Sequence, residues 1–392
     1  MSCPTPLEQM LRATTVARQA VIGLPASSSP MEHRFPFTPE GAGMLVAKGF
    51  KVRMEEGAAR HIHYSDQAYT RCGVEIVSRA DALAADIVVY LPAIEPHEAS
   101  RLKRGALLLT FMKGSDVSRS TLKILLERNI IALDLLQVRD HADNRPFRDI
   151  LQEIAGRASI SVAASLLADA IHGKGILLGG VAGVVPCEVM VIGSDMSACA
   201  AAQTAMGLGA TVRMFDNDIY RLREALRTLG PGVIGSTIHP RVFSSALRSA
   251  DIVVASETEN TSSVIGCDMV DVMKRGVICF DLTATPGAAF PSMQVVDLDL
   301  ASPSDNDPTE PTRMCYINAG NAVPRTVAMA LSNTFTTLLD DIMVCDGVTN
   351  ALKLNSGLRS AVLTFLGKCV SADIARKTGQ RHVDINLLIQ FS

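Results

Sequence analysis

The strongest constraint on the fold is a strand, a glycine turn and a helix that follow one another between residues 188 and 207. Glu188–Ile192 is an apolar strand, residues 193–198 read GSDMSA, and Ser197–Gly207 has a helical pattern. In the GxGxxG motif the first glycine permits the tight turn, the second lets the backbone approach a pyrophosphate, and the third lets the helix pack on the strand. Free N–H groups and the dipole at the helix N-terminus favour the anion. This segment predicts a Rossmann-type nucleotide domain.

Asp195 is the serious departure from this motif. Gly193 is present and Ala198 is a tolerable replacement for the third glycine, but Asp195 stands at the second glycine position. Its side chain occupies space that a pyrophosphate needs, and its charge adds a repulsion of roughly 4 kcal/mol at 4 Å with an effective dielectric constant of 20. That energy corresponds to on the order of a thousandfold in affinity. We therefore expect NAD binding to be weak or lost.

Asp216 follows the next predicted strand, Thr211–Phe215. It stands at the position of the carboxylate that binds the adenosine ribose in such domains, where it would favour NAD over NADP. The alternative is that Asp216 only caps a turn, and the sequence leaves both interpretations open.

Elsewhere, apolar strand-like runs alternate with helical patterns, which predicts βαβ units and parallel sheets. A chain of 392 residues exceeds one ordinary core, so we expect two domains. Further strands are predicted at residues 20–24, 51–55, 74–77, 86–91, within 104–111, and at 130–135, 251–255 and 277–282. Long helices are predicted over residues 146–172 and 321–339.

Composition and charge exclude several classes of protein. The formal net charge is −3, so no basic surface indicates nucleic acid as a partner. The nine cysteines are scattered without CxxC spacing, which favours a reducing cytosol. No apolar run approaches roughly 18 residues, so no membrane span is expected. Residues 1–20 are interpreted as an amphipathic helix and not a signal peptide, and residues 301–313 as a flexible loop.

Several longer segments resemble one enzyme family. GGVAGVVP at residues 179–186 leads into VMVIG at 189–193, and AMGLGA at 205–210 precedes FDN at 215–217. EHRFPFTPE at residues 32–40, Asn318, and AVPRT at 322–326 agree with the same family. Together, over roughly residues 20 to 340, they resemble the alanine dehydrogenase and transhydrogenase family, and the alanine dehydrogenases in particular.

The resemblance implies a domain organisation and an activity. It implies two Rossmann-like, doubly wound domains, with an NAD-binding domain at 149–317 inserted into a substrate domain made of 1–148 and 318–392. The family reaction is the reversible, NAD-dependent oxidative deamination of L-alanine to pyruvate. A small amino or keto acid is therefore the expected partner, and a homo-oligomer, commonly a hexamer in alanine dehydrogenases, is the expected assembly.

Two substrate-binding residues are carried over from the family pattern. Arg34 stands where the family has an arginine that grips the substrate carboxylate, for which the planar guanidinium is suited. The alternative for Arg34 is an ordinary surface arginine. Asn318 is the second residue assigned to the substrate.

The positions that correspond to catalytic groups have changed. Tyr90 stands where the resemblance places a lysine that binds the substrate carbonyl, and it offers only a phenol hydrogen bond. Lys113 replaces the acid/base histidine, and a lysine does that work only when burial lowers its pKa. The favoured interpretation of Lys113 is an ordinary solvated lysine. Asp281 matches the first aspartate near the nicotinamide, where it is either a cofactor contact or structural, but Thr285 replaces the second aspartate.

Three functional hypotheses follow. The chain is an NAD-dependent alanine dehydrogenase, a non-catalytic relative that acts in binding or regulation, or a reductase that uses Tyr90 and Lys113 as new proton donors. A metal centre is not predicted. His61 and His63 would share one face of a strand, but no third ligand is near in sequence, so surface histidines on a loop are the favoured interpretation.

Overall fold

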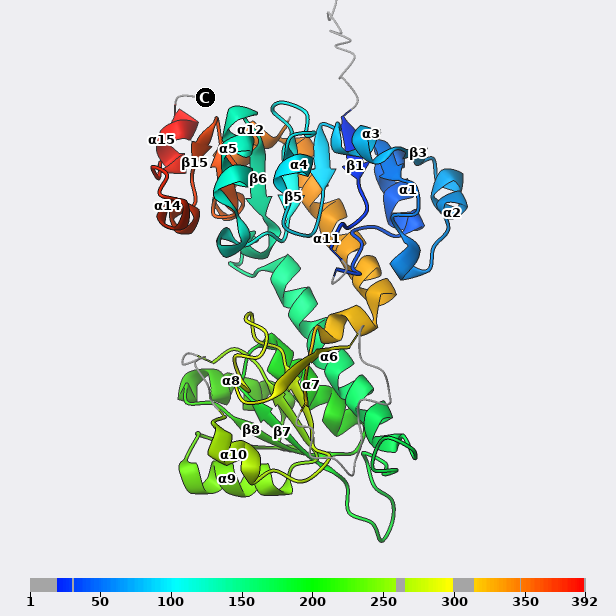
Figure 1. Cartoon of the computed structure of the whole chain (residues 1–392), viewed down its shortest axis with the longest axis vertical. Coiled ribbons are helices and arrows are strands. Elements are labelled where there is room, and N and C mark those ends of the chain that lie inside the picture. The colour runs from blue at the N-terminus through cyan, green and yellow to red at the C-terminus, as the bar shows by residue number, and fades with distance from the viewer. Residues whose placement is uncertain (1–19, 30–31, 259–264, 299–313, 346, 391–392) are drawn as a thin grey trace, which may run out of the picture.

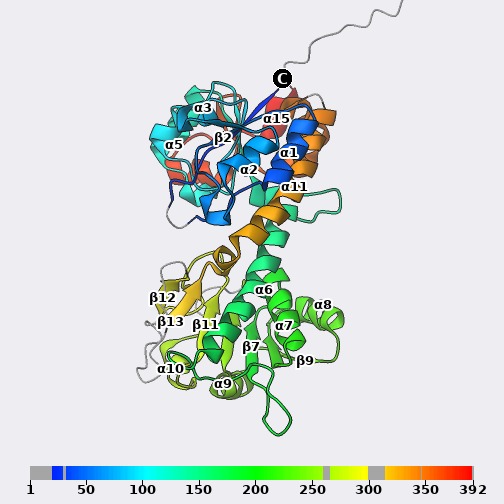
Figure 2. The ribbon, with the colours of Figure 1, turned by 90° about the vertical axis from the view of Figure 1, so that its right-hand side faces the viewer.

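The computed structural model describes residues 20–29, 32–258, 265–298, 314–345 and 347–390. They form two α/β units that follow one another along the long axis of the molecule (Figure 1). Two long helices, α6 (Pro146–Ala168) and α11 (Pro324–Val344), lie at the junction of the two units, as the rotated view also shows (Figure 2).

The first unit is built on an eight-stranded sheet with the order β15-β14-β6-β5-β4-β1-β2-β3. Its strands are β1 (Val21–Leu24), β2 (Lys51–Glu55), β3 (Glu75–Val77), β4 (Ile87–Val89), β5 (Leu107–Thr110), β6 (Ile131–Asp134), β14 (Val362–Phe365) and β15 (Lys368–Cys369). The first six are parallel and have the 3-2-1-4-5-6 order of a Rossmann sheet. β14 is antiparallel to both β6 and β15.

The second unit is built on a seven-stranded parallel sheet with the order β12-β13-β11-β10-β7-β8-β9. Its strands are β7 (Glu188–Ile192), β8 (Thr211–Phe215), β9 (Val233–Ser236), β10 (Ile252–Ala255), β11 (Ile278–Asp281), β12 (Gln294–Asp297) and β13 (Met314–Ile317). The winding direction reverses between β7 and β10, as it does between β1 and β4 in the first unit. Doubly wound sheets bind ligands at the carboxyl ends of the strands at such a reversal.

Helices cover both faces of the two sheets. In the first unit they are α1 (Pro39–Ala47), α2 (Asp66–Arg71), α3 (Arg79–Leu83), α4 (Pro96–Ala99), α5 (Arg119–Glu127), α12 (Val348–Leu354), α13 (Ser356–Arg359), α14 (Ala372–Thr378) and α15 (Ile385–Gln390). In the second unit they are α7 (Met196–Gly207), α8 (Ile219–Leu229), α9 (Pro240–Ser249) and α10 (Cys267–Asp271). Strands covered on both sides carry continuous apolar runs, as in the fully buried β4 and β5.

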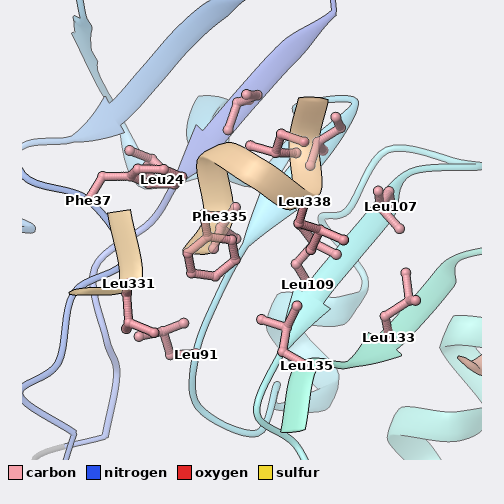
Figure 3. Packing of buried hydrophobic residues seen from close by; sticks show 14 of the residues in the cluster. Leu24, Phe37, Leu91, Leu107, Leu109, Leu133, Leu135, Leu331, Phe335 and Leu338 are labelled. Atoms are coloured by element: carbon pink, nitrogen blue, oxygen red, sulfur yellow. The ribbon is translucent and has the colours of Figure 1, made fainter. Parts of the chain in front are cut away.

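Helix α11 returns the chain to the core of the first unit. Leu331, Phe335 and Leu338 of α11 pack among leucines of the first sheet (Figure 3). The ring of Phe335 lies 5.2 Å from that of Phe37 and 4.9 Å from that of Phe147. The first unit is therefore discontinuous in sequence, with the second unit inserted between α6 and α11. The predicted fold class, two doubly wound α/β domains with one inserted in the other, is confirmed.

Several predicted elements have slightly different bounds. The helix predicted to reach residue 172 ends at Ala168, because Asp169 adopts an extended backbone and its carboxylate accepts the N–H groups of Ile171 and His172. Strands β9, β12, β13, β14 and β15 had not been predicted. The helix expected within residues 1–20 falls almost wholly outside the described residues, and the loop expected at 301–313 lies outside them entirely. The exact domain limits stay predictions.

Candidate functional site

The turn after β7 has the backbone conformation that the first glycine of the GxGxxG motif provides. Gly193 has a φ of 98°, a left-handed conformation that favours glycine. A Cβ atom at Gly193 would lie 2.2 Å from the Oγ of Ser256, which follows the neighbouring strand β10. The crevice between β7 and β10 is therefore closely packed at this point and requires glycine.

Asp195 caps the helix that follows this turn. Its Oδ1 accepts a hydrogen bond from the backbone N–H of Ala198 at 2.9 Å and one from the hydroxyl of Ser197 at 2.8 Å. Its Oδ2 accepts one from the amide of Gln152 on α6 at 3.2 Å. An N-terminal carboxylate of this kind satisfies free N–H groups and the positive end of the helix dipole. The place where a phosphate would bind α7 is thus taken by the chain's own anion.

Asp216 is also engaged within the protein. It is only 1% exposed, and its Oδ2 accepts a hydrogen bond from the hydroxyl of Ser194 at 2.5 Å. Its Oδ1 accepts the backbone N–H of Asp218 at 2.9 Å. Each oxygen of the carboxylate therefore accepts one hydrogen bond from within the protein. A dinucleotide would therefore meet an Asp216 carboxylate that already has donors and a helix N-terminus that Asp195 already caps.

A small pocket lies where the two units meet. It has a volume of about 170 Å³ and is lined by three of the predicted site residues, Arg34, Asp281 and Asn318. Apolar side chains complete the wall, among them Leu151 of α6 and Val327 of α11. The pocket therefore combines one cationic group and one carboxylate, those of Arg34 and Asp281, with apolar surface.

Arg34 is held in this pocket by a neighbouring carboxylate. Its Nε donates to Oε1 of Glu32 at 2.6 Å, and its Nη2 forms an ion pair with Oε2 of the same residue. The guanidinium also lies 5.2 Å from the ring centre of Phe111. Burial alone would lower the pKa of Arg34, but the charge and hydrogen bond of Glu32 outweigh it and raise that pKa. Arg34 is thus a fixed, permanently charged group.

Asp281 and Asn318 hold the loops that form the other side of the pocket. The carboxylate of Asp281 accepts the N–H groups of Thr283 at 2.8 Å and Ala289 at 3.2 Å, which folds the loop after β11. Asn318 has a φ of 56° and donates its side-chain amide to Asp297 at 2.6 Å. Both residues line the pocket, and both have structural bonds within the second unit.

The sequence matches two domain profiles described as alanine dehydrogenase/PNT, the N-terminal domain over residues 23–158 and the C-terminal domain over residues 159–372. The chain belongs to the alanine dehydrogenase/PNT family. It is 30% identical over 372 residues to an alanine dehydrogenase of Mycolicibacterium smegmatis, covering 91% of this chain and 96% of the relative. An alanine dehydrogenase of Staphylococcus saprophyticus is 28% identical over 376 residues, covering 93% and 98%.

Solved structures have the same fold. An L-alanine dehydrogenase superposes with a TM-score of 0.78 at 23% identity, covering 91% of this chain and 98% of the other. A transhydrogenase from Sinorhizobium meliloti gives a TM-score of 0.70 at 19% identity, covering 90% and 99%. The predicted membership of the alanine dehydrogenase and transhydrogenase family is confirmed.

Three residues placed at catalytic positions of the alanine dehydrogenase family do not line the pocket of Arg34. Tyr90 is 1% exposed and packs on the opposite face of the first sheet, where its hydroxyl bonds with Oγ of Ser28 at 2.5 Å and burial raises its pKa. Lys113 donates from Nζ to the backbone oxygen of Ala284 at 3.1 Å, so it bridges the two units. Thr285 is exposed on the loop after β11. Their proposed roles stay predictions.

Reasoning from the sequence missed two residues that shape this region. Gln152 reaches Asp195 from α6, and nothing in its local pattern indicates that contact. Glu32 orients Arg34, and its spacing of two residues from an arginine was the only available signal. The capping role of Asp195 had a clearer signal, because aspartate immediately before a helix is a frequent N-cap.

Metal and membrane expectations can be compared with the described residues. Among them no group of three or more histidine, cysteine, aspartate or glutamate residues could hold a metal ion, and the ring of His61 stacks on that of His33 at 4.3 Å. The described cysteines are all free. Helix α6 is long and apolar enough to span a membrane by length and composition alone, unlike the expectation. It packs against α7 and α11, as a core helix does.

Proposed function

We propose that this chain is a non-catalytic member of the alanine dehydrogenase/PNT family that binds a small carboxylic acid, such as an amino or keto acid, beside Arg34. The observation that carries the proposal is the carboxylate of Asp195 on the N-terminus of α7, where it accepts the N–H of Ala198. A pyrophosphate would have to displace this bonded anion and the amide of Gln152 with it. We therefore expect NAD binding to be weak or lost.

The pocket supports the choice of ligand. Its cation, Arg34, is charged at every physiological pH. Glu32 already pairs with its Nε and Nη2, so a ligand carboxylate would bind through the remaining nitrogen, Nη1. A volume of about 170 Å³ is small beside the roughly 300–1,000 Å³ of drug-sized sites, so the ligand is small. The walls of Leu151, Ala155 and Ile317 leave room for a short apolar side chain.

The second candidate function is the NAD-dependent deamination of alanine that the relatives' names indicate. Gly193 keeps the left-handed turn of a nucleotide site, which favours this candidate. Against it, neither Tyr90 nor Thr285 lines the pocket, and Lys113 is bonded to a backbone oxygen of the second unit. Within the part of the chain that the structure describes, no acid/base side chain lines the pocket near Arg34 except Asp281, whose two oxygens each accept a backbone N–H.

A titration with NADH, followed by its fluorescence, tests the proposal. We expect no saturable binding to the natural protein, and binding on the order of a thousandfold tighter for Asp195→Gly, because the repulsion and the steric block disappear. Asp218→Gly is the matched control, since Asp218 caps α8 in the same way but lies outside the turn. Micromolar NADH binding by the natural protein, or an alanine-dependent rise in NADH absorbance, would overturn the proposal.

The ligand is tested separately by thermal shift with L-alanine and with pyruvate. Either compound should raise the melting temperature of the natural protein, and Arg34→Leu should abolish that rise by removing the carboxylate's partner. If neither compound stabilises the natural protein, or if Arg34→Leu responds equally, the assignment of the pocket is wrong.

A homo-oligomer, as in the resemblance, completes the proposal. The hairpin at residues 179–186, closed by a bridge between Val181 and Val184, exposes both valines and Val185 to solvent. This hairpin projects from the free end of the second unit (Figure 1). Exposed apolar residues that gather in one place frequently mark a surface of association.

A further inference from the structure

A second cavity lies in the first unit, around the carboxyl end of β6. It has a volume of about 840 Å³ and shares no lining residue with the pocket of Arg34. Its walls come from the segment after β5, from the end of β6, and from α13, β14, the segment after β15, α14 and the start of α15. It is large enough for a ligand, since small-molecule sites usually measure roughly 300–1,000 Å³.

Three cations of this cavity are bonded to backbone oxygens and not to carboxylates. Lys113 donates to the carbonyl of Ala284 at 3.1 Å, Arg359 to that of Lys353 at 3.2 Å, and Lys377 to that of Ser115. A neutral carbonyl does not compensate the positive charge of its donor, although the charge of Lys113 also acts on Asp134, where it partly offsets the rise that burial causes in the pKa of that carboxyl. In the described part of the chain none of the three makes an ion pair.

The carboxylates of the cavity are either paired elsewhere or bonded to backbone. Asp373 pairs with Arg376 at 3.5 Å on the exposed side of α14, so these two charges cancel. Oδ1 of Asp384 accepts the N–H of Asn386 at 2.8 Å. Asp134 is 3% exposed, and its Oδ1 accepts the N–H of Leu136 at 3.0 Å. The lining thus has three unpaired cations against two carboxylates that already have donors.

We propose that this cavity binds a small polyanion, a dicarboxylate or a phosphate compound. Two guanidiniums line the cavity, and that of Arg359, which has no ion pair in the described part of the chain, offers the planar pair of donors that suits carboxylate and phosphate oxygens. The ammonium groups of Lys113 and Lys377, which also line the cavity, supply point charges. This proposed anion site in the first unit is distinct from the N-terminus of α7 in the second unit, where Asp195 takes the place of a bound anion.

Isothermal titration calorimetry with inorganic pyrophosphate and with citrate tests the proposal and separates the two sources of charge. We expect saturable binding of at least one probe at low ionic strength, weakened by salt. Arg359→Gln and Lys377→Gln should each weaken it about tenfold, because a hydrogen bond to a charged group contributes about 1.5–3 kcal/mol. The matched control is Lys123→Gln, an exposed lysine of α5 outside the cavity, which should bind normally.

Several outcomes would overturn the proposal. One is that neither probe binds. Another is that the natural protein and the double variant Arg359→Gln with Lys377→Gln bind the probe with equal affinity. The third is that Lys123→Gln loses as much affinity as the cavity variants do. Arg34→Leu keeps this test independent of the proposed function, since Arg34 lies in the other pocket. That variant should retain polyanion binding even if its response to L-alanine or pyruvate is lost.

Discussion

Asp195 and Tyr90 differ in how much of their behaviour could be predicted from the sequence. Aspartate immediately before a helical segment is a typical N-cap, so the bond from Asp195 to Ala198 follows from local pattern. The direction of Tyr90 does not. Side chains alternate between the faces of a strand, and Val89 and Leu91 on either side belong to the core on the other face. The face on which Tyr90 lies therefore depends on the register of the strand, which the local pattern of Tyr90 does not fix.

Asp134 gives a prediction about pH at the level of one side chain. Burial raises its pKa from the ordinary 3.8 to about 6, so folding favours the protonated form. This contribution to stability is complete below the unfolded value and is lost as the pH rises through about 6. The loss is on the order of 3 kcal/mol.

The measurement is the free energy of unfolding by urea at about pH 4 and about pH 8. Replacing Asp134 with Asn should reduce the difference between the two pH values, whereas Asp373→Asn, at an exposed site, should leave it unchanged. An unchanged difference in the Asp134 variant would contradict the role of burial.

At the scale of elements, strands with a clear local pattern were predicted best. β2, β7 and β8 have the expected bounds, because an apolar or alternating run followed by a turn is a strong local signal. β15 has only two residues, and β14 pairs antiparallel with the distant β6. β9 exposes two of its four residues. Such strands depend on tertiary pairing, so their local pattern is weak.

The contact between α6 and α7 gives a prediction for an element. A Cβ atom at Gly156 of α6 would lie 2.2 Å from the backbone oxygen of Ser197 on α7. Gly156→Ala should therefore push the helices apart and lower the free energy of unfolding by about 1–3 kcal/mol. Gly207→Ala is the control, since no atom lies within 4 Å of its Cβ position. Thermal melting of both variants checks this, and equal melting temperatures would contradict the close approach.

At the scale of the molecule, the family resemblance predicted that one unit is inserted into the other. It did not predict which residues form the contacts between the units. Arg148 of α6 pairs with Glu257 after β10, and Lys113 bonds to Ala284. These residues are far apart in sequence and carry no shared pattern. The pocket of Arg34 depends on the same meeting of the units, so its composition could be predicted only in part.

The exposed hairpin at residues 179–186 gives a prediction for the assembly. Val185 is 86% exposed, so Val185→Asp should leave the fold intact while it weakens an apolar contact between copies of the chain. Mass photometry should show a smaller assembly for Val185→Asp than for the natural protein. The control is Tyr220→Asp, because Tyr220 is also exposed but lies on α8, outside the hairpin. A natural protein that is already monomeric would contradict the expected homo-oligomer.

The cap on α7 also has a genetic consequence. Both aspartate codons become glycine codons through one A-to-G transition at the second base. The residue that closes the phosphate cradle is therefore a single point mutation away from the residue that the motif requires, while Gly193 and Ala198 already stand in place. A gene that encodes this chain can therefore acquire the motif glycine at position 195 by one base change. Natural variants at codon 195 would show whether this change has occurred.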